Sequence, residues 1–301
     1  MSFPLATAVV AVSASLSIAK VVSDFIRTRR ERLASEIHPK EFRPVTVAEA
    51  REIAPGVLLL ILRVPEGSTF HLPPGKHVQL AATLPDGSFV QRSYTPVETT
   101  IPGRLDLLIR VYPNGKMGTH LKGLSKGDTV LMRGPTGKLQ YTLSSFLVGT
   151  HAVPARDILM LAGGTGITPM VQIVKAVLRN AAHDRTRLTL VYASSTPEDV
   201  LLYHELCALA EHHREQFTLV LTVSRPNEGW GKAPSSAVVH ETGRICPEMV
   251  TKHMPSYLGQ RPFPDWAVAG YCGPPAFEAC AKGVLQSIGF GSGNAVNLFR
   301  W

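Results

Sequence analysis

The sequence predicts a small antiparallel β-barrel followed by an α/β domain with a doubly wound parallel sheet, with a hydrophobic helix at the N-terminus. Three observations predict this arrangement. Short apolar runs separated by turn residues fill residues 42–138, strand-like and helix-like runs alternate from residue 157 onward, and the first residues form a long uncharged run. With 301 residues, of which 45% are hydrophobic and 18% charged, the chain is long enough for two globular domains. We place these domains at residues 40–148 and 155–301, after an N-terminal segment of residues 1–35.

The N-terminal segment is expected to be an uncleaved membrane anchor followed by a basic stretch. Residues 3–19 carry no charge, and a helix continuing to Val22 reaches about the 20 apolar residues that a span needs if Lys20 extends to the interface. A cleaved signal peptide or a mitochondrial transit peptide is the alternative, although each usually carries basic residues before or within its apolar run. Here they follow it, at Arg27, Arg29, Arg30 and Arg32. The positive-inside rule then keeps the rest of the chain in the cytosol, on the endoplasmic reticulum or the outer mitochondrial membrane.

The barrel domain is predicted from short strand-like runs with no convincing long helix among them. The runs are GVLLLILRV (56–64), KHVQLAATL (76–84), SFVQRSYTPV (88–97), RLDLLIRVY (104–112) and DTVLMRG (128–134). Turn sequences such as LPPG and IPG separate them, and the Asp86-Gly87 pair between two runs is a hairpin signal. Only MGTHLKGL (117–124) reads as a helix. Strands at this spacing are typical of a small antiparallel barrel.

The second domain is predicted from a regular alternation of strands and helices, after a less patterned connection over residues 141–156. The predicted strands cover 157–163, 187–194, 217–224 and 266–273, and the predicted helices cover 168–181, 198–213, 246–254 and 275–289. Such alternation requires crossover connections, which are almost always right-handed and place the strands parallel.

A glycine-rich stretch, AGGTGITPM, follows the first strand of this domain. Gly163, Gly164 and Gly166 let the backbone adopt conformations that other residues avoid and let a ligand approach its N–H groups. We expect Thr168 to cap the following helix and Pro169 to occupy its first position, so that unpaired N–H groups face the loop. The motif is not the G-x-G-x-x-G fingerprint, and an ordinary strand-to-helix turn is the alternative.

A second strand end carries the sequence Cys272-Gly273-Pro274-Pro275, ahead of Phe277 on the predicted last helix. Alone, it reads as a buried structural cysteine before a proline-started helix. Because the carboxyl ends of parallel strands meet at one edge of the sheet, this segment and the glycine-rich stretch are expected to face the same cleft.

The barrel supplies two further motifs. In R-S-Y-T-P, the guanidinium of Arg92 has the planar fork that grips a diphosphate, and Tyr94 can lie against a flat ring. In IRVYPNGKMGTHL, a strand carrying Tyr112 runs into a glycine turn and a short helix, whose N–H groups can meet phosphate. An edge-strand aromatic and a solvated lysine at Lys116 are the structural alternatives.

The net charge and the cysteine content limit the classes of partner, cluster and compartment that the sequence allows. The chain has 31 basic and 23 acidic residues, a net charge of +8, which favours an acidic partner, a phosphorylated ligand or an anionic membrane. No basic block interleaved with aromatics is present, so nucleic acid is not expected as a partner. The four cysteines form no C-x-x-C pair, which argues against a thiolate-held cluster and for a reducing compartment. We expect no metal site, because the histidines at 204, 212 and 213 lack suitable partners.

The order of these four motifs resembles that of the ferredoxin-reductase-like flavoproteins and, within them, the NADH–cytochrome b5 reductase family, over residues 42 to 290. The resemblance implies FAD on the barrel, NADH on the α/β domain, and cytochrome b5 or a similar acidic one-electron acceptor as partner. It implies that Thr95, Thr168 and Cys272 lie nearest the reacting rings. The implied cofactor-binding residues are Arg92, Tyr94, Thr95, Pro96, Ile109, Val111, Tyr112, Lys116, Met117, Gly118, Thr119, Gly163, Gly164, Thr165, Gly166, Thr168, Pro169, Cys272, Gly273, Pro274 and Phe277.

Two departures from the family pattern leave alternatives open. Gly118 stands where the family usually has a serine, and Thr119 follows it. Ser224 and Arg225 stand where many NADH-preferring members carry an acid that meets the adenine ribose, so NADPH use is an open possibility. Alternative functions are a flavin reductase feeding a nitrate reductase, a desaturase or a quinone, and a membrane-tethered adaptor that has lost the chemistry.

Overall fold

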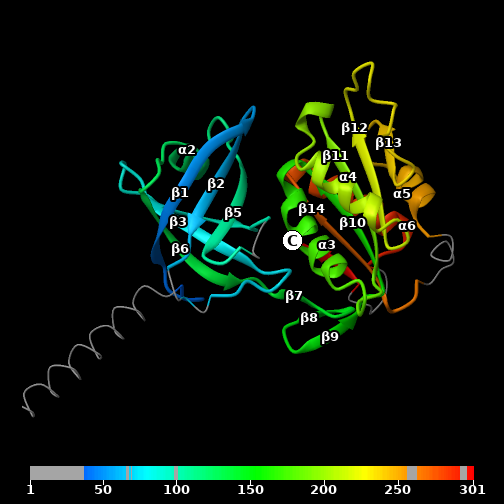
Figure 1. Cartoon of the computed structure of the whole chain (residues 1–301), viewed down its shortest axis with the longest axis horizontal. Coiled ribbons are helices and arrows are strands. Elements are labelled where there is room, and N and C mark those ends of the chain that lie inside the picture. The colour runs from blue at the N-terminus through cyan, green and yellow to red at the C-terminus, as the bar shows by residue number, and fades with distance from the viewer. Residues whose placement is uncertain (1–36, 66–67, 69, 98–100, 256–262, 292–296) are drawn as a thin grey trace, which may run out of the picture.

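The computed structural model describes residues 37–65, 68, 70–97, 101–255, 263–291 and 297–301, which form two lobes joined by a small third sheet (Figure 1). The antiparallel sheet comes first in the chain and the parallel sheet second, which confirms the predicted fold of both domains. The predicted anchor, within residues 1–35, lies outside the described residues. In the part of the chain that is described, we find no helix with the length and apolarity needed to cross a bilayer.

The first lobe is a six-stranded antiparallel sheet curled around one core. Its strands, in the order β4-β3-β6-β1-β2-β5, are β1 (Arg43–Ala54), β2 (Val57–Arg63), β3 (His77–Thr83), β4 (Phe89–Tyr94), β5 (Arg104–Arg110) and β6 (Thr129–Thr136). Inward-facing side chains alternate along the strands, as Leu58, Leu60 and Leu62 do in β2. Just beyond the edge strand β4, the N–H of Val97 donates to the carbonyl of Asp106 in β5 at 2.9 Å, so the two edges of the sheet approach one another.

The Asp86-Gly87 hairpin is confirmed, because β3 and β4 pair across it with Thr83 opposite Phe89. The short helix predicted over 117–124 is observed as α2 (Lys116–Lys122). Strand β1 was absent from the predicted strands. Its apolar residues Val45 and Val47 alternate with polar ones, and its second half is largely exposed, so it offers no continuous apolar run.

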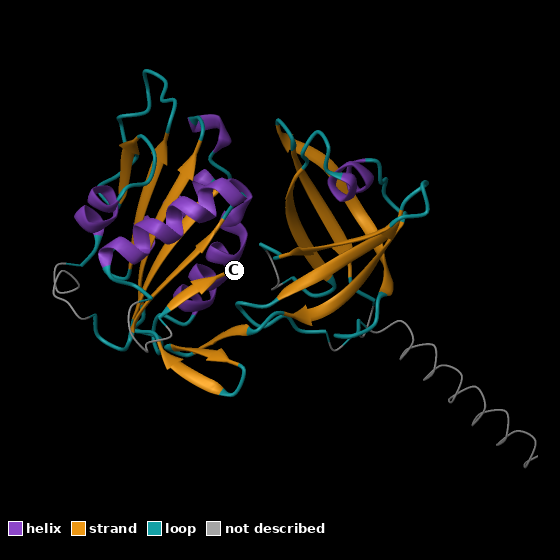
Figure 2. Cartoon of the chain, turned by 180° about the vertical axis from the view of Figure 1, so that it is seen from behind, coloured by secondary structure: helices purple, strands orange, loops and turns teal. Residues whose placement is uncertain are grey.

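The second lobe is a six-stranded parallel sheet in the order β13-β12-β11-β10-β14-β15. The strands are β10 (Asp157–Gly163), β11 (Arg187–Ser194), β12 (Phe217–Val223), β13 (Val238–Thr242), β14 (Ala267–Cys272) and β15 (Leu298–Arg300). Helices α3 (Ile167–Arg179) and α4 (Tyr203–His212) share one apolar cluster, while α5 (Pro247–His253) and α6 (Pro275–Ile288) share another. The two clusters lie on opposite faces of the sheet, so helices cover both (Figures 1 and 2).

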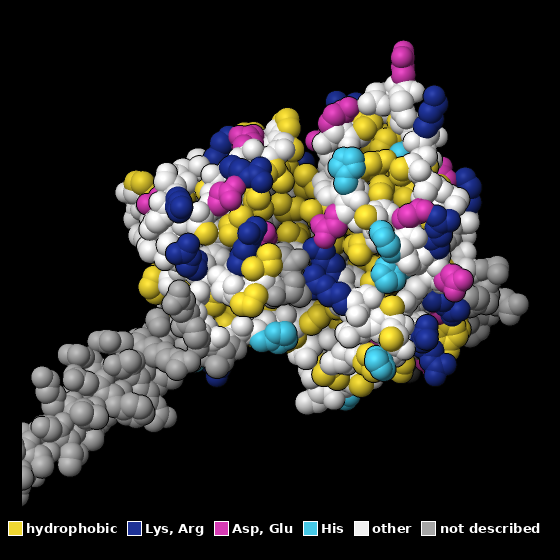
Figure 3. Space-filling view, viewed as in Figure 1, with side chains coloured by type: hydrophobic (Ala, Val, Ile, Leu, Met, Phe, Trp, Pro, Cys, Tyr) yellow, Lys and Arg dark blue, Asp and Glu magenta, His cyan; other side chains and the backbone are white. Residues whose placement is uncertain are grey.

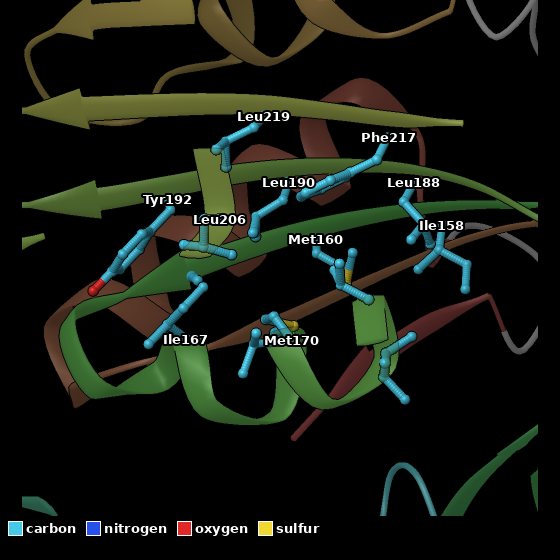
Figure 4. Packing of buried hydrophobic residues seen from close by; sticks show 14 of the residues in the cluster. Ile158, Met160, Ile167, Met170, Leu188, Leu190, Tyr192, Leu206, Phe217 and Leu219 are labelled. Atoms are coloured by element: carbon cyan, nitrogen blue, oxygen red, sulfur yellow. The ribbon is translucent and has the colours of Figure 1, made fainter. Parts of the chain in front are cut away.

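Alternate residues of β10 enter the two clusters, which explains why this strand reads as an unbroken apolar run. Ile158 and Met160 pack with α3, whereas Leu159 and Leu161 pack with α6. Figure 4 shows the first cluster, in which side chains from α3 and α4 meet those of β10, β11 and β12. The strands β13 and β15 were missed by the sequence analysis because each lies at an edge of the sheet and is short.

The connection that lacked a pattern is a three-stranded antiparallel sheet of β7 (Leu139–Thr142), β8 (Ser145–Val148) and β9 (His151–Pro154). Four-residue strands are too short to establish a period, which is why the sequence did not reveal them. The Tyr141 hydroxyl donates to Asp184 Oδ2 at 2.6 Å, and the Ser144 hydroxyl donates to Asp184 Oδ1 at 3.1 Å. Burial and the Asp184 carboxylate raise the pKa of the Tyr141 phenol. This network fastens the small sheet to the second lobe.

The two lobes share part of their apolar interior. Val57, Val97 and Leu108, on the outer side of the barrel, belong to the same cluster as the α3 face of the parallel sheet. Buried polar groups add directional contacts: Gln172 Oε1 accepts from the Gly75 N–H at 2.6 Å, and Lys175 Nζ donates to the Val97 carbonyl at 2.9 Å. Helix α3 therefore fixes how the barrel sits against the second domain.

Replacing Asp184 by alanine should lower the free energy of unfolding by about 3 kcal/mol, because buried donors from Tyr141, Ser144 and Thr186 lose their charged acceptor. The change is measured as a fall in the midpoint of urea unfolding followed by circular dichroism. Asp265→Ala, at an exposed position, is the control and should stay within about 0.5 kcal/mol of the parent chain. Equal midpoints for the two variants would contradict the structural role of Asp184.

Candidate functional site

A cavity of about 640 Å³ lies where the barrel meets the carboxyl edge of the parallel sheet. Its size falls in the range of about 300–1,000 Å³ typical of ligand pockets. The space-filling view shows a hollow between the two lobes (Figure 3). The cavity is lined by His77, Arg92, Ser93, Tyr94, Thr95, Leu108, Ile109, Arg110, Tyr112, Gly115, Lys116, Met117, Gly118, Thr165, Gly166, Thr168, Pro169, Cys272, Gly273, Pro274, Pro275, Arg300 and Trp301.

Strand β4 places Arg92 and Tyr94 on the same side of the sheet, because side chains two apart in a strand share a face. Arg92 is exposed and has no ion-pair partner among the described residues, so its guanidinium is available to an anion. Tyr94 is half-buried, and burial raises the pKa of its phenol to about 12 despite the nearby Arg92. Tyr94 is therefore neutral at physiological pH and presents an aromatic face with a hydroxyl donor.

The start of α2 supplies backbone rather than side chains to the cavity. Gly118 is buried, and a Cβ built on it would lie 3.3 Å from Cα of Val111, so the helix lies closely against the chain after β5. A serine there would require its neighbours to shift by a few tenths of an ångström. The ammonium of Lys116 pairs with Asp86 at 2.9 Å. The hydrogen bond from the Ser88 hydroxyl and, after it, the one from Lys116 lower the pKa of the Asp86 carboxyl. Thr119 lines a separate hollow beside Asp86.

The glycine-rich loop differs in detail from its prediction. A 3₁₀ turn, η1 (Gly164–Gly166), runs directly into α3, so that Gly166 is the N-cap and Ile167 the first helical residue. We expected Thr168 to be the cap and Pro169 to be the first residue of the helix, and both predictions were wrong. Proline is tolerated at this third position because the first N–H groups of a helix have no intrahelical partner in any case.

Close approach explains the glycines of this loop. A Cβ on Gly166 would overlap the Cys272 carbonyl group, and one on Gly163 would lie 2.6 Å from Cγ of Phe277. Gly164 has a φ of +53°, in the left-handed region. Its carbonyl accepts a hydrogen bond at 3.0 Å from the Tyr192 hydroxyl, which emerges from the apolar cluster of Figure 4. The strand ends of β10 and β14 therefore meet backbone to backbone.

Cys272 ends β14 in the wall of the cavity. Burial, with a smaller effect of the Glu278 carboxylate, raises the pKa of its thiol to about 12, so it is a neutral thiol and not a nucleophilic thiolate. Beside it, the Trp301 indole occupies the space that a side chain at Gly270 would fill. The indole contacts the Phe146 ring edge-on at a centroid distance of 5.8 Å. Its Nε1 is buried and has no hydrogen-bond partner among the described residues.

A second cavity of about 490 Å³ follows the carboxyl ends of β10 to β13. Arg110, Tyr112, Thr165 and Pro274 line both cavities, so the two meet at a common wall. The second cavity is also lined by Gly163, Gly164, Ala193, Ser194, Ser195, Asp199, Ser224, Gly243, Arg244, Ile245, Ala276, Phe277 and Cys280.

The structure thus brings together nearly all the residues that the sequence analysis chose. Pro96 and Val111 do not line either cavity, and Thr119 faces the separate hollow. The motifs did not point to His77, Arg110, Arg300 and Trp301 in the first cavity or to Ser194, Ser195, Asp199 and Arg244 in the second. Three of these, Ser194, Ser195 and Arg244, stand at or just beyond observed strand ends, and strand-end position is the signal that could have found them. Asp199 ends the 3₁₀ turn η2 (Pro197–Asp199) instead.

The donor set of the first cavity fits a flavin dinucleotide. It offers an unpaired guanidinium at Arg92, backbone at Gly115–Gly118, and a wall of Tyr94, Leu108 and Ile109 for a flat ring. The second cavity is bordered by a glycine loop in which Gly163 has no room for a side chain and Gly164 adopts the left-handed conformation. That arrangement at the edge of a parallel sheet fits a dinucleotide.

Comparison with known protein families supports both assignments. Residues 44–141 match the oxidoreductase FAD-binding domain, and residues 160–283 match the oxidoreductase NAD-binding domain. The predicted cofactors, FAD and a nicotinamide dinucleotide, are confirmed at this level.

Individual relatives extend the comparison over most of the chain. It is 34% identical to NADH-cytochrome b5 reductase 1 of Neosartorya fischeri, across 84% of this chain and 77% of that protein. It is 33% identical to the protein of the same name from Aspergillus fumigatus, across 95% and 85%. Among solved structures, the cytochrome b5 reductase domain of Ulva prolifera nitrate reductase is 29% identical, with a TM-score of 0.74 over 88% of this chain and 99% of that chain. The ferredoxin NADP+ reductase from Neisseria gonorrhoeae, at 19% identity, shares the fold with a TM-score of 0.61 over 87% and 98%.

Gly166→Ala should weaken NAD+ binding about tenfold or more, because the added Cβ forces the glycine loop away from the Cys272 backbone. Isothermal calorimetry of NAD+ measures the effect. Gly283→Ala in α6 is the matched control, since its Cβ meets nothing within 4 Å. It should keep NAD+ affinity and add about 0.5–1 kcal/mol of stability. An unchanged affinity in Gly166→Ala would show that the close approach is not needed for binding.

Proposed function

The chain belongs to the NADH–cytochrome b5 reductase family, as its motifs predicted, and we propose that it transfers electrons from NADH through FAD to cytochrome b5. One observation carries the proposal: the cavity that fits FAD and the cavity that fits the dinucleotide share the wall formed by Arg110, Tyr112, Thr165 and Pro274. Two ligands filling these cavities would meet there, and hydride transfer requires the reacting atoms to be at about 3–3.5 Å.

A bound flavin supplies the chemistry of this reaction, since it accepts a hydride and returns the electrons singly. The chain's own residues position and enclose the reactants. Thr168 and Pro169 are buried at the start of α3, and together with the partly buried Cys272 they form one wall of the first cavity. Because hydride transfer needs no general base, the neutral thiol of Cys272 and the neutral phenol of Tyr94 suit the site.

Two observations support an acidic electron acceptor such as cytochrome b5: the net charge of the chain and its similarity to known reductases. A net charge of +8 favours an acidic protein, and association between oppositely charged surfaces is accelerated by electrostatic steering. The similarity to the reductase domain of a nitrate reductase supports a second candidate, in which this chain supplies electrons to another acceptor module. A direct competition between acceptors separates the two.

We also propose that residues 1–35 anchor the chain to the endoplasmic reticulum or the outer mitochondrial membrane, with both domains in the cytosol. The support is the uncharged run of residues 3–19 and the arginines that follow it. An anchor would hold the enzyme on the same surface as a membrane-bound acceptor and raise their effective concentration.

The purified chain should be yellow, should bleach when NADH is added without oxygen, and should then reduce soluble cytochrome b5. Arg92→Leu should weaken FAD binding about tenfold to a hundredfold, because a diphosphate loses its charge-assisted contact. Loss of flavin fluorescence on titration measures this affinity. Arg63→Leu, an exposed arginine at the end of β2, is the control and should bind FAD normally. A colourless chain that cannot be loaded with FAD would contradict the proposed enzymatic function and favour a membrane-tethered adaptor that has lost the chemistry.

The membrane proposal predicts that the full chain floats with liposomes in a density gradient and that a chain lacking residues 1–35 stays at the bottom. Both forms should bleach equally with NADH, because the deleted residues precede both cavities. Recovery of the full chain in the soluble fraction, with retained NADH oxidation, would rule out the anchor while leaving the reaction intact.

A further inference from the structure

The second cavity has a direction that is set by the sheet. Its shared wall with the first cavity lies at β10, and from there its lining passes Ser194 at the end of β11, Ser224 after β12 and Arg244 after β13. A dinucleotide whose nicotinamide meets the shared wall must extend along this edge. Its adenosine half therefore lies against the ends of β11, β12 and β13.

Positive charge gathers at this far end. Arg244 lines the cavity, is exposed, and has no ion-pair partner among the described residues. Arg225 directly follows Ser224 and is also exposed without an ion-pair partner in the described part of the chain. Its backbone N–H donates to the Ser195 carbonyl at 2.9 Å, which fixes the β12 end against the β11 end. The unpaired guanidinium of Arg244 thus lines the adenosine end of the cavity, and Arg225 adds positive charge next to Ser224 without lining the cavity.

Negative charge is scarce at the same place. Among the residues lining the second cavity, Asp199 is the one acid. Its carboxylate lies 4.0 Å from Arg110 and accepts a hydrogen bond from the Thr196 hydroxyl at 3.2 Å, so its charge is balanced on the side of the shared wall. At the end of β12 the cavity presents Ser224, whose hydroxyl donates to the Ser195 carbonyl at 3.4 Å. A serine offers no charge to repel a phosphate.

We propose that this end of the cavity binds the 2′-phosphate of NADPH, so that the chain accepts NADPH as a hydride donor alongside NADH. This inference rests on the proposed function for its site and extends it to a second substrate. A dianionic 2′-phosphate gains charge-assisted hydrogen bonds from an arginine fork, whereas a carboxylate at position 224 would repel it. Arg244 and Ser224 are then the residues that determine nucleotide specificity.

A binding measurement tests the pocket without electron transfer. Isothermal calorimetry of the FAD-loaded chain compares 2′,5′-ADP with 5′-AMP, which differ only by the 2′-phosphate. The parent chain should bind 2′,5′-ADP about tenfold tighter or more, and Arg244→Ala and Ser224→Asp should each reduce that preference about tenfold. Arg185→Ala is the charge-matched control, because this exposed arginine precedes β11 at the opposite edge of the sheet. It should change the preference by less than about twofold.

Steady-state rates give the second readout. The ratio of kcat/KM for NADPH to that for NADH should fall in Arg244→Ala and Ser224→Asp, and it should stay unchanged in the Arg185→Ala control. Equal affinity for 2′,5′-ADP and 5′-AMP in the parent chain would overturn the inference, whatever the activity. If neither nucleotide reduces the flavin but 2′,5′-ADP is still preferred, the proposed reaction fails and the phosphate pocket stands.

Discussion

Helix α3 holds the site together, because it is the element that both domains bind. Its buried Gln172 and Lys175 contact backbone atoms of the barrel, at Gly75 and Val97, while its first turn follows directly from the glycine loop. Val97 comes two residues after Thr95 of the R-S-Y-T-P segment. A backbone partner cannot rotate away as a side chain can, and an unmade bond to a buried amide or ammonium would be costly. The spacing of the two cavities is therefore fixed by one rigid helix.

The parallel sheet brings residues that are distant in the sequence together at one edge. All six strands point the same way, so the ends of β10 to β14 form one edge along which the dinucleotide cavity runs. The approach of Gly166 to the Cys272 carbonyl group brings two of these ends into direct contact. Catalytic power in such a site comes from placing two bound rings side by side and keeping water out, since the neutral thiol of Cys272 and the phenol of Tyr94 carry no charge at physiological pH.

Much of the fold and site could be predicted from the sequence, and the failures have physical causes. The sequence predicts strands such as β10 because they are continuous apolar runs. It also predicts the glycine motifs at strand ends, because both signals depend only on residues close together in the chain. The start of α3 was misplaced because a 3₁₀ turn carries the chain into the helix two residues early. Strands β7 to β9 are too short to show a period. Trp301 reaches the first cavity through tertiary packing alone, and nothing in its own neighbourhood marks it. Arg244 follows the short edge strand β13, and because the sequence did not reveal that strand, it did not reveal Arg244 either.

The pairing of Gly270 with Trp301 has an evolutionary consequence. The indole fills the volume that a side chain at Gly270 on strand β14 would take. The backbone N–H of Trp301 donates to the carbonyl of the next residue, Tyr271, at 3.2 Å, which holds the indole beside this strand. Neither position can change size alone without a clash or a void, since interiors are packed to the density of organic crystals. Positions 270 and 301 are therefore coupled in sequence space: alanine or any larger residue at position 270 requires a smaller side chain at position 301.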